Sequence, residues 1–252
     1  MSGFLQVNGK DILLSEALCW SAIEDSPSFV ESTRDRALIR QYALETGISV
    51  SEGELQEVID KVRRELGLES AANTESWLTA NRFSLGDFQS ACAHLILQEK
   101  IWQSFTNDDV AGYFAENRED FTRVTLYGAR LKDKATAEDI VTRVNAGEAN
   151  FHLEAMEHSA DLETAPLGGY VGRLTRQEVP EEISVSVFSV DPGELIGPIK
   201  LEEGFGLFLV SDIHRPELED VEQEIRNRLF DQLLEGLLER AVVSVGDQGD
   251  RS

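Results

Sequence analysis

The chain has 252 residues, of which 41% are hydrophobic and 28% charged, a composition typical of a globular protein with one large or two modest domains. Acidic residues outnumber basic ones by 47 to 23, which gives a formal net charge of −24. This charge argues against a nucleic-acid partner, because phosphate contacts need clustered Lys and Arg, and it favours basic partners.

Residues 1–20 lack the cationic start and unbroken apolar run of a secretory signal. No stretch approaches the roughly 20 apolar residues of a membrane span. We therefore expect a cytoplasmic protein without a membrane span. Cys19 and Cys92 lie far apart among apolar neighbours, which is typical of buried thiols rather than of a disulfide or a metal site.

Apolar residues at helical intervals predict that the first half of the chain is helical. One helix is expected to start at Ser51, because Glu54 three positions later completes a capping-box pattern. The predicted helical segments are 26–47, 49–68, 73–83, 84–105 and 107–121.

The apolar pattern changes at about Thr122 and predicts a mixture of strands and helices. Within it, 181–190 fits a helix or a strand, and 197–213 reads as a hairpin. Gly193 and Gly204 are expected in tight turns, and Gly168 and Gly169 in a loop with positive φ. The other predicted elements are a strand at 123–131, helices at 135–151 and 151–159, and a helix with an apolar stripe from Leu218 to Leu238.

This order of elements predicts an α+β chain with two domains. The first is a helical N-terminal domain at 1–120, completed by a C-terminal helix at 217–243. The second, at 121–214, contains a small antiparallel sheet with flanking helices.

The second domain contains three informative runs. "AEDIVTRVNAGEANFHLEAMEHSAD" combines an Ala-containing helix, a Gly-to-Phe step and a Ser-x-Asp loop. "LGGYVGRLTRQEVPEEISVSVFSVDPGELIGPI" and "GFGLFLVSDI" add a Gly-Gly-x-x-Gly strand, a Gly-Glu-x-x-Gly-Pro turn and a final strand. In this order, residues 122–213 resemble the parvulin-type (PpiC-like) peptidyl-prolyl isomerases. The helical flanks resemble those of the SurA-like foldases.

The resemblance implies that this domain rotates X-Pro peptide bonds. Rotation crosses a barrier of about 18–20 kcal/mol, because the twisted amide loses its resonance. A protein lowers this barrier with an apolar pocket for the proline ring and with groups that favour the twisted amide. Shape and polarity suffice for this, so neither a cofactor nor a metal is expected.

The resemblance also implies the site residues. Asp161 falls beside the substrate carbonyl as the catalytic residue, although a loop carboxylate that caps its own backbone is an alternative. Parvulins carry one histidine on the first strand and one on the last, where this chain has Gly128 and Phe208. The implied substrate-binding residues are Leu174, Val179, Ile183, Phe188 and Phe208, and the alternative is that they only form a core.

Two functions follow as expectations. One is a foldase that isomerises X-Pro bonds in peptides or unfolded proteins, weakly because of the missing histidines. The other is a non-catalytic parvulin-fold chaperone or adaptor that binds peptides. The client of such an adaptor could be a dedicated secreted or modified peptide, which would associate the protein with an export or maturation system.

Overall fold

The computed structural model describes residues 4–23 and 28–245, and its contacts divide the chain into two compact units. The first unit takes the residues up to Val110 and those from Gln223 on, and the second takes Ala111–Glu222. The division therefore falls inside helices α6 (Asn107–Asn117) and α10 (Leu218–Arg240), whereas the sequence placed the bounds near 120 and 215. The predicted α+β fold class is confirmed.

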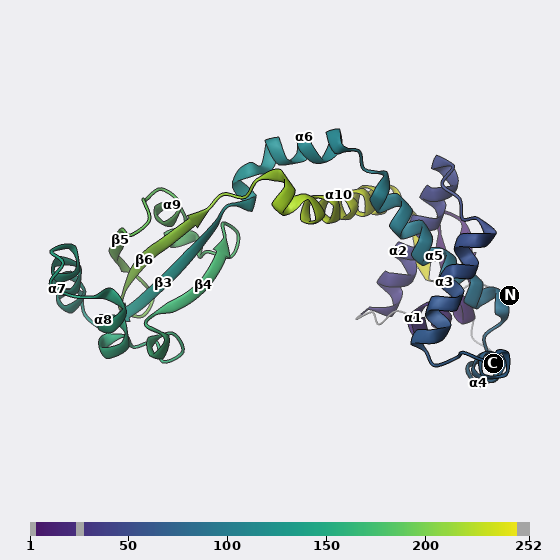
Figure 1. Ribbon diagram of the computed structural model, residues 1–252, viewed down its shortest axis with the longest axis horizontal. Coiled ribbons are helices and arrows are strands. Elements are labelled where there is room, and N and C mark those ends of the chain that lie inside the picture. The colour runs from purple at the N-terminus through teal and green to yellow at the C-terminus, as the bar shows by residue number, and fades with distance from the viewer. Residues whose placement is uncertain (1–3, 24–27, 246–252) are drawn as a thin grey trace. The chain divides into compact units, whose positions relative to one another are not determined.

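The first unit is mainly helical (Figure 1). Ser51 and Glu54 form the predicted capping box, in which each side chain bonds the other residue's backbone N–H. Trp20 and Phe88 are among the largest side chains buried in its core. Its helices, besides parts of α6 and α10, are α1 (Leu14–Ile23), α2 (Phe29–Thr46), α3 (Glu52–Glu65), α4 (Ala71–Asn81) and α5 (Leu85–Ser104).

A three-stranded antiparallel sheet in this unit joins the two ends of the described chain. Its order is β2 (Lys10–Ile12), β1 (Leu5–Val7) and β7 (Val243–Val245). Asn8 in the turn strengthens the junction, because its side-chain oxygen accepts a bond from the Val242 N–H at 2.9 Å. This sheet is not predicted from the sequence, since three-residue strands are too short to show an alternating pattern. The last helix accordingly ends at Arg240, before the predicted residue 243.

The second unit is a four-stranded antiparallel sheet with helices on both faces (Figure 1). Its strand order is β4-β3-β6-β5, so the hairpin of β5 and β6 is confirmed. The ambiguous segment 181–190 forms a helix over most of its length. The elements are η1 (Arg118–Phe121), β3 (Arg123–Leu131), α7 (Lys134–Asn145), α8 (Phe151–His158), η2 (Ala165–Leu167), β4 (Tyr170–Thr175), α9 (Glu181–Val187), β5 (Leu195–Lys200) and β6 (Phe205–His214).

Alternation along the strands gives this sheet two apolar faces. Tyr127, Ala129 and Leu131 of β3 pack with α7 and α8. Val124 and Leu126 of the same strand lie on the other face and pack with α9. Every predicted pocket residue belongs to the face covered by α9, so the candidate site lies on this face.

Candidate functional site

The two positions where a parvulin would carry histidines lie next to each other. Gly128 on β3 and Phe208 on β6 are direct partners in the antiparallel register. A β-carbon at Gly128 would lie 3.4 Å from two ring atoms of Phe208 and 3.3 Å from a methyl group of Val171. Because Gly128 has no side chain, the Phe208 ring and Val171 cover the surface at this position of β3.

A second glycine provides the remaining space for this ring. A β-carbon at Gly206 would lie only 2.6 Å from Phe208 Cε2 and 2.8 Å from Cζ, closer than ordinary contacts allow. The Phe208 ring thus lies over Gly206 of its own strand and reaches the neighbouring strand at Gly128. We call the Phe208 ring, with Gly128 and Gly206 beneath it, the aromatic platform. It depends on both glycines.

The loop before β4 also approaches this platform closely. Gly169 has φ of 84°, and its carbonyl accepts the Gly128 N–H at 2.7 Å. A β-carbon at Gly169 would lie 2.5 Å from the Gly128 carbonyl oxygen, so the contact requires glycine there. The positive φ predicted for Gly168 and Gly169 is confirmed, and Gly193 and Gly204, which were predicted in tight turns, also have positive φ.

The structure brings all five predicted substrate-binding residues into one hydrophobic cluster. Val179 and Ile183 are its buried members, with 4% and 2% of their surfaces exposed. Leu174, Phe188 and Phe208 pack against them and are partly exposed. For Val179 and Ile183 the burial agrees with the alternative of a purely structural role, whereas the other three could touch a ligand.

Phe188 has a cationic neighbour. The guanidinium carbon of Arg176 lies 4.4 Å from the centre of its ring, a cation–π geometry. Arg176 also lies 3.9 Å from the carboxylate of Glu119. This edge of the cluster therefore combines an aromatic surface with a positive charge.

Asp161 lies in the loop after α8, and its carboxylate bonds its own loop. Oδ1 of Asp161 accepts the Glu163 N–H at 3.0 Å. This bond, together with bonds from Thr164 and the charge of Arg130, lowers the pKa of Asp161 although partial burial opposes the shift. The carboxylate is ionised at neutral pH, and the alternative of a backbone-capping role describes its contacts.

The Asp161 loop is attached to the same region of the sheet as the aromatic platform. The Ala160 N–H donates to the Arg130 carbonyl at 2.7 Å, and the Arg130 N–H donates to Ser159 Oγ at 3.1 Å. Arg130 is the register partner of Gly206, over which the Phe208 ring lies. An ionised carboxylate and an apolar platform are thus held by adjacent strand positions.

His152 and His158 do not replace the two missing histidines. His152 packs edge-on to Tyr127, with ring centroids 4.5 Å apart, on the sheet face covered by α7 and α8. Its Nδ1 lies 3.1 Å from the Gly168 carbonyl oxygen. His158 lies 3.5 Å from Glu154. Within residues 4–23 and 28–245, no cluster of three His, Cys, Asp or Glu side chains could hold a metal ion.

The family comparison matches this unit. The rotamase family described as the PPIC-type PPIASE domain matches residues 127–212, which include the platform, the Asp161 loop and the sheet. These residues form a parvulin-type peptidyl-prolyl isomerase domain. The resemblance predicted from the sequence is therefore confirmed. No helix in the described part of the chain is long and apolar enough to cross a membrane.

The relatives extend the similarity to the flanking helices. The chain is 22% identical to the foldase protein PrsA of Halalkalibacterium halodurans, over 96% of this chain and 76% of that protein. It is 24% identical to the chaperone SurA of Xanthomonas oryzae pv. oryzae, over 67% of this chain and 40% of that protein. A crystal structure of PrsA from Bacillus cereus shares the fold, with a TM-score of 0.51, 16% identity and coverage of 93% of this chain and 87% of that chain.

Two contributors to the site were missed at the sequence level. Gly206 provides space for the Phe208 ring, and Arg130 both anchors the Asp161 loop and lowers the pKa of its carboxylate. The Gly-Phe-Gly run at 204–206 was a usable signal for the first, because a glycine inside a strand often marks a close approach. Arg130 has no such signal, since its role follows from strand pairing.

Proposed function

We propose that the chain is a foldase whose parvulin-type domain binds apolar, proline-containing segments on the α9 face and rotates X-Pro bonds slowly. The observation that supports this most is the partly exposed Phe208 ring, which lies over Gly128 and Gly206 on the pair of strands whose Arg130 anchors the Asp161 loop. The ring offers an apolar surface to a pyrrolidine ring. The names of the relatives, foldase and chaperone, agree with a polypeptide substrate.

The expected rate is low because hydrogen-bonding side chains are missing where a parvulin has two imidazoles. Gly128 has no side chain and Phe208 carries only a hydrocarbon ring. Asp161 supplies a fixed negative charge that stabilises the charge distribution of the amide in its twisted state. Its contribution belongs to the transition state, so it should affect the rate more than the affinity.

A second candidate is a non-catalytic peptide-binding chaperone of the same fold. It is favoured by the bond between the Asp161 carboxylate and the Glu163 N–H, which engages one carboxylate oxygen within its own loop. In this case the platform binds peptides without accelerating rotation. The two candidates share the binding surface and differ only in whether the rotation of the X-Pro bond is accelerated.

Exchange NMR on a short X-Pro peptide separates the two candidates. For a foldase, the wild type accelerates cis–trans exchange, and Asp161→Ala lowers the rate with little change in peptide affinity. Glu163→Ala is the matched control, because it removes a nearby exposed carboxylate and keeps the N–H that Asp161 accepts. Peptide binding without acceleration would identify the non-catalytic chaperone, and absence of both would refute the proposal.

Phe208→Ala tests the binding surface in the same experiment. We expect it to weaken peptide binding, since the partly exposed ring supplies apolar contact area. Val179 and Ile183 are unsuitable for this test because their burial means that any change would act through stability.

The client and the cellular location are finer proposals. A dedicated secreted or modified peptide, an export system and a cytoplasmic location stay predictions. Affinity purification from a native extract, followed by mass spectrometry, would support a dedicated client by recovering one peptide precursor. A broad set of nascent proteins would contradict it.

A further inference from the structure

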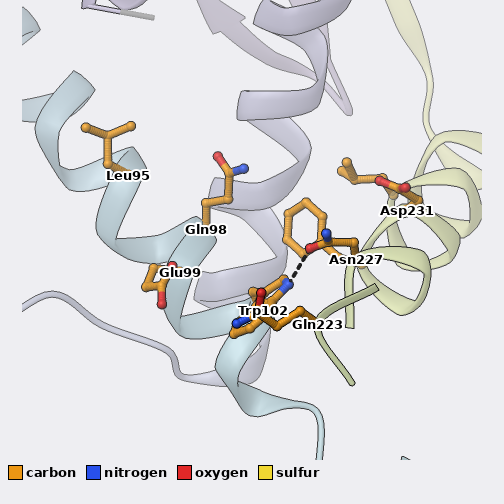
Figure 2. Close-up of a pocket in the computed structure, with 9 residues that line it drawn as sticks. Leu95, Gln98, Glu99, Trp102, Gln223, Asn227 and Asp231 are labelled. Atoms are coloured by element: carbon orange, nitrogen blue, oxygen red, sulfur yellow. Dashed lines mark hydrogen bonds between the residues drawn. The ribbon is translucent and has the colours of Figure 1, made fainter. Parts of the chain in front are cut away.

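The helical unit carries a groove that the proposed isomerase site does not use. It lies between α5 and α10 and encloses about 850 Å³. This volume falls within the range of about 300–1,000 Å³ that is usual for ligand pockets. Figure 2 shows side chains from both helices around one hollow, with Trp102, Gln223 and Asn227 gathered at one end.

One end of the groove is held by polar contacts between the two helices. Nε1 of Trp102 donates to Oδ1 of Asn227 at 2.8 Å, as the dashed line in Figure 2 shows. Arg226 stacks on the Trp102 ring at 5.5 Å and donates to the Phe105 carbonyl at 2.6 Å. The indole is thus fixed in place before any ligand arrives, which reduces the entropy cost of binding.

The lining combines apolar side chains with carboxylates. Leu95, Trp102, Phe230 and Leu234 supply the apolar surface. Among the described residues that line the groove, the charged ones are Glu99 and Asp231, both acidic and both exposed.

A second hollow of about 500 Å³ between α3 and α5 extends this surface, because it shares Leu95 and Glu99 with the groove. Its other charged residues are Glu54, Glu57, Glu65, Lys61 and Lys100. Each lysine is already near a glutamate: Lys100 lies 2.7 Å from Glu54 and Lys61 lies 3.9 Å from Glu65. The combined surface therefore keeps an excess of negative charge along an apolar path.

We propose that the α5–α10 groove binds a client segment in which apolar or aromatic residues are flanked by lysine or arginine. The apolar side chains would enter the groove, and the cations would lie against Glu99 and Asp231. The net charge of −24 adds a long-range attraction for such segments. The inference rests on the proposed function only in taking the occupant to be a client polypeptide.

A second carboxylate close to Asp231 supports the charge argument. Although Asp231 is exposed, desolvation by the atoms around it, together with the neighbouring Glu235, raises its pKa. A bound cation would relieve this unfavourable interaction between carboxylates. The acidic wall of the groove is therefore better suited to a positively charged occupant than to a neutral or acidic one.

Fluorescence anisotropy with labelled, proline-free peptides tests the inference on the full chain. The peptides share an aromatic and aliphatic centre and differ in having lysines or glutamates on both sides. We expect the lysine-flanked peptide to bind about tenfold more tightly, and its affinity to fall as salt rises. A lysine-flanked peptide with serines in place of the apolar centre should lose most of its binding. The absence of proline separates this binding from the isomerase site.

The matched variants localise the binding. Glu99→Gln with Asp231→Asn should weaken binding of the lysine-flanked peptide about fivefold. Glu45→Gln with Glu239→Gln removes the same charge from exposed positions outside the groove and should leave the affinity unchanged. An equal loss in both pairs would show that net charge alone attracts the peptide, and would overturn the inference.

Further outcomes of these measurements also test the inference. Equal affinity for the two flanked peptides, or no binding of either, would overturn the inference. Sedimentation that shows a dimer dissociated by the groove pair would assign the groove to a second copy instead. X-Pro exchange is measured on the same variants, and we expect the groove pair to retain it. Groove binding without any acceleration of X-Pro exchange would refute the proposed isomerase activity and would still support this inference.

Discussion

Phe208 lies directly opposite Gly128 across the β3–β6 ladder, with two ring atoms 3.4 Å from the place of a Gly128 β-carbon. The same ring lies 2.6 Å from the place of a Gly206 β-carbon. We therefore expect Gly206→Ala to destabilise the protein by about 1–3 kcal/mol, because the new methyl group must displace the ring. Urea unfolding measures this change in the free energy of unfolding.

A double-mutant cycle provides the control. In a Phe208→Ala background the close contacts with the ring are gone and the 3.0 Å contact with Leu201 Cδ1 remains, so Gly206→Ala should cost much less than in the wild type. An equal cost of Gly206→Ala in both backgrounds would contradict the packing argument.

His94 should make stability depend on pH. Burial, with smaller contributions from Arg36 and Arg40, lowers the pKa of this imidazole from 6.5 to about 3. Between these pH values the unfolded chain binds a proton that the folded chain does not, so stability is lost as the pH falls. The expected loss is about 1.4 kcal/mol per pH unit.

The comparison with His94→Phe isolates this effect from the titration of carboxylates. The substitution keeps an aromatic ring beside Trp20, whose ring centroid lies 6.1 Å from that of His94. Urea unfolding at pH 7 and pH 5 should show a smaller loss for the variant than for the wild type. Identical pH profiles would mean that folding does not change the pKa of His94, and would contradict this prediction.

Helix α10 should be indispensable for the first unit. Phe230, Leu233 and Leu234 pack with Ile39 and Ile101 of α2 and α5. Ending the chain before Gln223 would expose this apolar surface, and we expect aggregation, which light scattering detects. A soluble truncated protein with a cooperative melting transition would show that α1 to α5 are self-sufficient.

The two cysteines should be unreactive in the folded protein. Burial raises the pKa of the Cys19 and Cys92 thiols to about 12, with Asp87 adding to the effect at Cys19. Since the thiolate is the nucleophile, a disulfide reagent should modify neither thiol until urea unfolds the chain. Fast labelling without denaturant would point to opening of the α1–α5 core.

Features with a local sequence signal were predictable. The capping box at Ser51 and the turn glycines at 193 and 204 each depend on a few neighbouring residues, and the structure has them all. The three-stranded sheet was not predictable, because its pairing joins Leu5 to Val245 and depends on contacts across the whole chain. Segment 181–190 was ambiguous because helical burial on α9 and strand alternation both fit its apolar residues.

The residues of the site could be predicted from the sequence, but their arrangement could not. The resemblance collected Leu174, Val179, Ile183, Phe188 and Phe208, and the structure does place them in one cluster. Their exposure could not be read from the sequence, since it depends on how α9 covers the sheet. The contact of Phe208 with two glycines likewise arises from the β3–β6 register.

The pairing of β1 with β7 has a consequence for biosynthesis. During translation the second unit is complete once residue 222 has left the ribosome, because its chain is contiguous from Ala111. The helical unit must wait for Val243–Val245 before its sheet can close. Domains generally fold as they emerge, and contacts distant in sequence form late. The isomerase domain is therefore expected to fold while α1 to α5 still hold part of their apolar surface uncovered, a period in which the nascent chain itself would be a substrate for other chaperones.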